Sequence, residues 1–118
     1  MKYMILIYGE EKGWASMTKS QMDEVMAAYV TYTRDMRSAG VHIAGHELNQ
    51  VSSATTVRVR GGKVQTTDGP FAETKEQLGG YYLIEAKNLD EAIRWAAKCP
   101  SSASGSIEVR PIIEHPEA

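Results

Sequence analysis

The sequence predicts one mixed α+β domain in which both helices lie on the same face of an antiparallel sheet. Two amphipathic helical segments with well-defined N-terminal caps alternate with short apolar segments of strand length. The chain has 118 residues, of which 42% are hydrophobic and 24% charged, and this length leaves room for a single domain over residues 1–118.

The first strand and the first helix are the clearest elements. Residues 3–8 are apolar at every position, which predicts a strand buried on both faces, and residues 9–13 form a polar loop after it. Thr18 and Gln21 have the spacing of a capping box, and Gly40 ends the helix as a left-handed C-cap. The apolar positions at helical spacing between these ends are Met22, Val25, Met26, Tyr29, Tyr32 and Met36.

A β-hairpin is predicted in the middle of the chain. Residues 56–60 and 63–66 flank Gly61 and Gly62, which supply the positive φ angles of a two-residue turn. In this register Val59 pairs with Val64, so that valines share one face and charged residues the other.

The remaining predicted elements are strands over 41–48, 81–86 and 106–113, a helix that Asn88 caps and Pro100 ends, a flexible loop over 101–106 and a frayed tail over 114–118. Without the hairpin the order is strand, helix, strand, strand, helix, strand, which is the ferredoxin-like βαββαβ arrangement. Two helices cover only one face of such a sheet, so the doubly apolar first strand predicts that a second copy covers the other. The result is a homodimer with a cavity between its sheets. The alternative is a monomer whose tyrosines and hairpin cover that face.

Composition excludes several classes of function. Thirteen Lys and Arg against fifteen Asp and Glu give a net charge of −2, which argues against nucleic acid as a partner. The apolar run at residues 3–8 is too short for a membrane span. A single cysteine, Cys99, excludes a disulfide framework and favours a cytoplasmic location.

Asp68 opens the most unusual segment of the chain. It either accepts backbone hydrogen bonds in a tight turn or faces a cavity as a base or as an acceptor for a polar ligand. Phe71 is predicted to anchor this loop and Glu73 to be presented near a strand end. Arg58, on the polar face of the hairpin, is either solvated or receives an anionic group.

His46 is the second candidate catalytic residue. It forms a pair with Asp68 only if two strand ends are adjacent, and such a pair suits proton transfer near neutral pH. The alternative is a packed or solvated histidine. Tyr81 and Tyr82 point to opposite faces of their strand, so that one faces the helices and the other the space between sheets, as ligand wall or as dimer interface.

No metal and no cofactor are predicted. On a strand, His42 and His46 lie roughly 13 Å apart, too far to share one ion. The glycine pairs at 61–62 and 79–80 lack the spacing of a phosphate-binding loop.

The stretch from Asp68 to Phe71, read Asp-Gly-Pro-Phe and followed by residues 73–82, resembles the signature of the DGPF subgroup of YCII-related proteins. Residues 54–58, 88–96 and 107–111 are similar to the same subgroup. This resemblance implies a dimeric α/β barrel built on the ferredoxin-like fold. Members are mostly uncharacterised, and some are encoded beside extracytoplasmic-function sigma factors. The broader family has a proposed His/Asp site whose histidine is on the first helix; this first helix has none, and His46 is the histidine offered instead.

Two functions therefore stand as hypotheses. The first is a small cytoplasmic dimer that binds or transforms a small molecule in a cavity between the sheets. Asp68 would be the base or acceptor, His46 the proton carrier, and Glu73 or Arg58 a positioning group. The second is a non-catalytic accessory protein associated with an alternative sigma factor. Whether the protein is an enzyme stays open.

Overall fold

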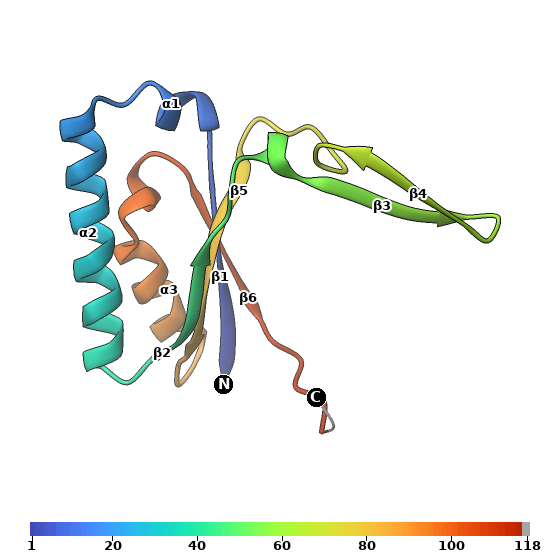
Figure 1. The fold of residues 1–118 in the computed structure, drawn as a ribbon. Coiled ribbons are helices and arrows are strands. Elements are labelled where there is room, and N and C mark those ends of the chain that lie inside the picture. Colours follow the sequence, from blue (N-terminus) through green and yellow to red (C-terminus); the bar gives the residue numbers. More distant parts are fainter. Residues whose placement is uncertain (117–118) are drawn as a thin grey trace.

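A computed structural model describes residues 1–116 of the chain. Its four-stranded antiparallel sheet has the order β2-β5-β1-β6, built from β2 (His42–Glu47), β5 (Gln77–Glu85), β1 (Lys2–Gly9) and β6 (Ser106–Pro111). The helices α2 (Lys19–Ser38) and α3 (Leu89–Lys98) both lie on one side of this sheet (Figure 1). The mixed α+β class is confirmed, and the order of strands and helices is the ferredoxin-like one.

The predicted helix caps are present. The Thr18 hydroxyl accepts a hydrogen bond from the Gln21 backbone N–H at 3.1 Å, and the Gln21 side chain accepts one from the Thr18 N–H at 2.9 Å. Gly40 follows the helix with a φ of +75°. The Asn88 side chain accepts from the Glu91 N–H at 3.0 Å. These contacts satisfy backbone groups that a helix end leaves unpaired. The cap residues therefore predict correctly where each of the two helices begins.

The predicted hairpin forms a separate two-stranded sheet, β3 (Thr55–Arg60) with β4 (Lys63–Asp68). Its register is the predicted one, with Val59 opposite Val64, and both turn glycines have positive φ angles. Figure 1 shows that this hairpin, called here the arm (residues 55–68), projects away from the domain on the side of the sheet opposite the helices. The arm pairs only with itself.

The core lies between the helices and one face of the sheet. Tyr3, Ile5 and Ile7 of β1 are buried there against residues that include Tyr32 and Met36 of α2. The alternate residues of β1 face the other way and are only half-buried. This second face is called here the outer face, and the six apolar residues that β1 and β5 place on it are Met4, Leu6, Tyr8, Leu78, Tyr81 and Leu83. Within one chain, the first strand is therefore buried on its helix face alone.

Three segments differ from the prediction. The expected polar loop after β1 contains the short helix α1 (Glu11–Ala15), whose Trp14 ring packs against glycine backbone: a Cβ atom on Gly79 would lie 2.7 Å from that ring. The connection between β2 and the arm contains a 3₁₀ turn, η1 (Val51–Ser53). The expected flexible loop begins with η2 (Pro100–Ala103), in which Ser101 is buried.

The end of the chain is described up to residue 116. In the predicted tail, Glu114 forms an ion pair with Lys2 at 2.8 Å, and residues 117–118 lie outside the described part. No helix within residues 1–116 combines the length and the apolar character needed to cross a bilayer.

Candidate functional site

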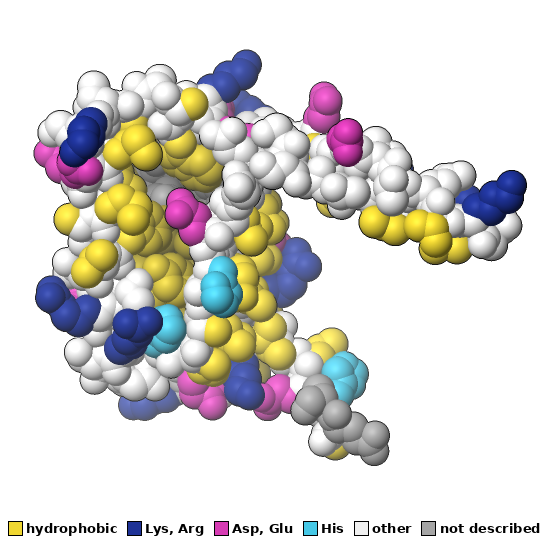
Figure 2. Space-filling model, in the orientation of Figure 1, with side chains coloured by type: hydrophobic (Ala, Val, Ile, Leu, Met, Phe, Trp, Pro, Cys, Tyr) yellow, Lys and Arg dark blue, Asp and Glu magenta, His cyan; other side chains and the backbone are white. Residues whose placement is uncertain are grey.

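A cleft of about 520 Å³ opens between α2 and the sheet, on the helix side. Figure 2 shows it as a hollow lined by hydrophobic side chains beside α2. Most of its apolar wall comes from α1, the connection after it and the first half of α2, and this part includes Trp14, Met17, Met22, Val25, Met26 and Tyr29. This cleft lies within one chain and is distinct from the predicted cavity between two sheets, which stays a prediction.

The cleft exists because the sheet offers little to fill it. Gly45, Gly79 and Gly80 lie on its floor, and none of them has a side chain to reach α2. Gly45 also lets the Tyr82 ring approach, since a Cβ atom there would lie 2.5 Å from the ring. The first half of α2 therefore stands clear of the sheet, and Met22 and Met26 stay 51% and 54% exposed.

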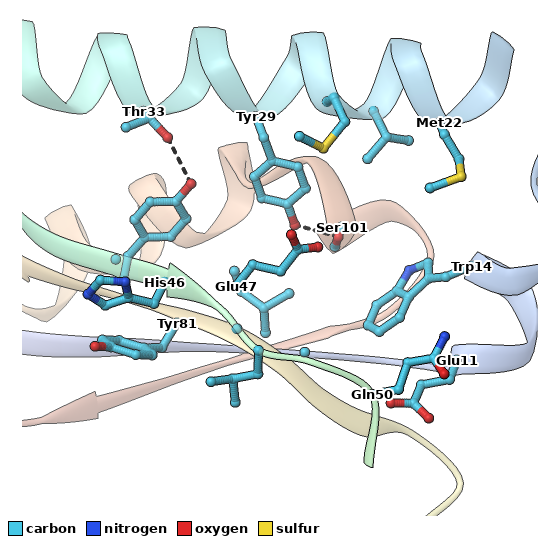
Figure 3. Close-up of a pocket in the computed structure, with 18 of the residues that line it drawn as sticks. Glu11, Trp14, Met22, Tyr29, Thr33, His46, Glu47, Gln50, Tyr81 and Ser101 are labelled. Carbon is cyan, nitrogen blue, oxygen red and sulfur yellow. Dashed lines mark hydrogen bonds between the residues drawn. The ribbon is translucent and has the colours of Figure 1, made fainter. Parts of the chain in front are cut away.

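Two pairs of hydroxyl groups line the inner wall. The Tyr29 hydroxyl lies 2.5 Å from the Ser101 hydroxyl, and the Thr33 hydroxyl lies 2.8 Å from the Tyr82 hydroxyl (Figure 3). Each pair contains two hydroxyl hydrogens and uses only one in its mutual bond, so the Thr33–Tyr82 pair has one hydrogen left to donate. The Tyr29 oxygen also lies 3.5 Å from the Cys99 sulfur, and the Ser101 hydrogen is the one left over when Tyr29 donates to Ser101. Burial raises the pKa of both tyrosines, which keeps these phenols protonated.

Glu47 supplies a carboxylate to the cleft. In Figure 3 its side chain points into the cavity, toward the side from which Tyr29 projects. The strand register explains this orientation: Glu47 pairs with Gly80, while the preceding residue pairs with Tyr81 on the opposite face. His46 is a predicted site residue, whereas Glu47 beside it is not. Two-residue alternation, applied to β2 once its buried face was known, would have found Glu47.

His46 and Tyr81 border the cleft, but their register places them with Leu6 on the other face of the sheet. Their rings lie 5.7 Å apart. Tyr82 is on the helix side, where it contacts Tyr32 edge-to-face at 5.4 Å. The two adjacent tyrosines thus point to opposite faces, as strand alternation predicts, and only Tyr82 belongs to the inner wall.

The other predicted site residues lie outside the cleft. Arg58 and Asp68 are exposed on the arm, and Glu73 is exposed in the loop after it. Asp68 and His46 belong to different sheets, and no hydrogen bond or ion pair joins them within residues 1–116. Phe71, predicted to be an anchor, is 80% exposed, because the loop extends from the arm rather than from the core.

The turn after Asp68 is held by backbone atoms. The Gly69 N–H donates to the Ala54 carbonyl at 2.7 Å, and the Thr56 hydroxyl donates to the Gly69 carbonyl at 2.8 Å. The Asp68 carboxylate accepts no hydrogen bond from the described part of the chain. Its side chain is therefore available for a contact outside this chain.

The remaining candidate groups give no reactive centre. Cys99 is buried, and burial raises the pKa of its thiol. Burial also lowers the pKa of His42, with a smaller contribution from the positive charge of Arg37. Within residues 1–116, no three His, Cys, Asp or Glu side chains gather in a geometry that could hold a metal ion.

Comparison with known proteins identifies the family. A family model described as the YCII-related domain matches residues 1–116. An uncharacterised protein of Rhizobium meliloti (strain 1021) is 37% identical over 114 residues, which cover 95% of this chain and 92% of that relative. Both matches extend over nearly the whole sequence, cleft and arm included, and the chain therefore belongs to the YCII-related family.

Proposed function

We propose that this protein binds a small, largely apolar molecule that carries a hydrogen-bond acceptor, such as a carbonyl or phenolic oxygen, in the cleft beside α2. The observation that carries the proposal is the cleft itself, whose volume of about 520 Å³ lies within the range typical of small-molecule sites. Its mainly apolar wall with a few convergent polar groups is also typical of such sites.

Each side chain has a distinct part in this proposal. The Trp14 ring and the methionines of α2 contact the apolar body of the ligand. The free hydroxyl hydrogens of the pairs that contain Tyr29 and Tyr82 donate to its oxygen. Glu47, at the mouth, accepts a hydrogen bond or a proton from a ligand hydroxyl.

We further propose that the functional form is a homodimer in which two sheets pack through their outer faces. Three apolar pairs lie side by side there, namely Met4 with Leu83, Leu6 with Tyr81, and Tyr8 with Leu78. Beyond β1, the neighbouring β6 presents Glu108 and Arg110 on the same face. An apolar centre with a polar border is the composition of a protein interface.

The ligand site is tested by a melting-temperature screen of aromatic ketones, phenols and related fragments, run on the wild type, Tyr29→Phe and Tyr32→Phe. A ligand bound to the folded state raises the melting temperature. We expect Tyr29→Phe to lose that increase for compounds bound through the cleft. Tyr32→Phe is the matched control, since its hydroxyl donates to the Trp95 carbonyl and lies outside the cleft lining.

A second pair of variants blocks the cleft sterically. Met26→Trp places a large ring over the apolar wall, whereas Thr31→Trp places the same ring on an exposed position of α2 outside the cleft. We expect only the first to abolish binding. If no compound stabilises the wild type, or if both tryptophan variants bind equally, the ligand proposal is wrong. The accessory-protein hypothesis, with a sigma factor as partner, then becomes the one to test.

A further inference from the structure

The arm carries an apolar surface that nothing within residues 1–116 covers. Val57, Val59 and Val64 share one face of the hairpin, and they are 59%, 58% and 71% exposed. The opposite face holds Arg58, Arg60 and Lys63 toward solvent. Isolated two-stranded hairpins are only marginally stable in water, so a projecting arm with three exposed valines on one side requires a partner surface.

The dimensions of the chain show how much surface is left to cover. The radius of gyration is 16.3 Å, whereas a compact domain of this length has about 13.5 Å. The accessible surface is 8431 Å², against about 6,300 Å² for a compact monomer of this mass. The excess of roughly 2,000 Å² is within the range that each chain buries in an obligate homodimer.

The direction of the arm indicates which molecule covers it. The arm leaves the sheet on the side of the outer face, away from the helices (Figure 1). In Figure 2 the hydrophobic side chains of the arm lie on its underside, toward the open space beside the sheet. The face of the arm that carries the three valines (the valine face) and the outer face of the sheet therefore border the same open corner.

A second copy fits this corner in size. Facing sheets pack about 10 Å apart, and a six-residue strand spans about 20 Å. The arm is therefore longer than the gap between two facing sheets. An arm that starts at one sheet reaches the facing copy and lies along the edge of that copy's sheet. Two-fold symmetry makes this exchange mutual, because each chain then offers one arm and receives one.

We infer that the arm docks through Val57, Val59 and Val64 on a second copy of this chain and clasps the dimer. This inference rests on the proposed homodimer and adds to it a second, reciprocal contact surface. Asp68 lies opposite Thr55 on the same face of the hairpin as the valines, at the root of the arm. Docking therefore turns the Asp68 carboxylate, which bonds to no group in the described part of its own chain, toward the other copy.

Two neighbouring substitutions on β4 test the inference. Val64→Glu puts a carboxylate on the valine face, and Gln65→Glu puts the same carboxylate on the opposite face, across from Arg58. Both side chains are exposed in a single chain, so neither change disturbs the core. The mass in solution is measured by sedimentation velocity over a range of concentrations, relative to 13.0 kDa for one chain.

We expect the wild type and Gln65→Glu to have twice the mass of one chain, and Val64→Glu to dimerise at least about tenfold more weakly. A wild type that is monomeric would overturn both the proposed homodimer and the clasp. A Val64→Glu variant that dimerises as tightly as the wild type would overturn the clasp alone and leave the sheet contact standing. A variant in which residues 55–68 are replaced by a short glycine–serine linker gives an independent check, and unchanged dimerisation there would also refute the clasp.

Discussion

The two halves of α2 have the same apolar periodicity and opposite surroundings. In the second half, Tyr32 and Met36 are buried against the sheet and α3. In the first half, Met22 and Met26 are about half exposed and face the cleft. An apolar stripe at helical spacing therefore predicts which face of a helix turns toward the rest of the domain, but not whether anything fills the space beneath that face.

The difference comes from what lies opposite each half. The second half faces branched and aromatic side chains, among them Ile84 and Tyr82. The first half faces Gly79 and Gly80, whose backbones cannot fill the gap. Because the two halves of α2 are packed so differently, equivalent substitutions in them are expected to have unequal effects on the free energy of unfolding.

The largest effect is expected for Met36→Ala compared with Met26→Ala. Met36 is fully buried, so its truncation leaves a cavity and lowers the free energy of unfolding by about 2–5 kcal/mol. Met26 is 54% exposed, and its truncation costs less than about 1 kcal/mol because little buried surface is lost. Urea denaturation of both variants measures the difference. Equal costs would show that the first half of α2 is packed after all.

A smaller effect is expected for Tyr32→Phe. The Tyr32 hydroxyl donates to the Trp95 backbone carbonyl at 2.8 Å and ties the second half of α2 to α3. Without it, the free energy of unfolding falls by about 1–2 kcal/mol, since a largely buried carbonyl loses its donor. If the free energy of unfolding depends on urea concentration with the same slope as in the wild type, the substitution has changed stability alone. A cost near zero would mean that water replaces the hydroxyl.

Thr18→Ala tests how the first half of α2 is held. Because packing there is sparse, the capping box is its main local support, and its loss costs about 1 kcal/mol. Amide hydrogen exchange is expected to accelerate in the first turns of α2 and to stay unchanged around Met36. Thr18→Ser keeps the hydroxyl and should restore slow exchange. Acceleration along the whole helix would contradict the separation of the two halves.

The smallest effect concerns pH and His42, beside the second half of α2. Burial, aided by the charge of Arg37, lowers the pKa of His42 below its usual value near 6.5. As pH falls through 6.5, the unfolded chain therefore takes up a proton before the folded chain does, and stability decreases toward the lower folded pKa. Above that window His42 contributes no pH dependence. Stability measured between pH 7.5 and pH 5 should decline less steeply for His42→Gln, and an identical decline would contradict the shift.

The local elements could be predicted from the amino-acid sequence alone, because their signals lie within a few residues of one another. The Thr18–Gln21 capping box, the Asn88 cap, the Gly61–Gly62 turn and the register of the hairpin valines depend on spacing alone, and each is present. The resemblance to YCII-related proteins was equally visible in contiguous motifs and is confirmed over residues 1–116.

The position of the cleft and the groups that face it could be read only from the tertiary structure. Trp14, Ser101 and Glu47 come from segments far apart in the sequence, and nothing local marks them as neighbours of Tyr29. The same holds for Asp68: the sequence leaves open whether it adjoins His46, and the fold places it on the projecting arm. Distances between such residues depend on how helices and hairpin leave the sheet, and that packing is set by long-range contacts that no short stretch of sequence contains.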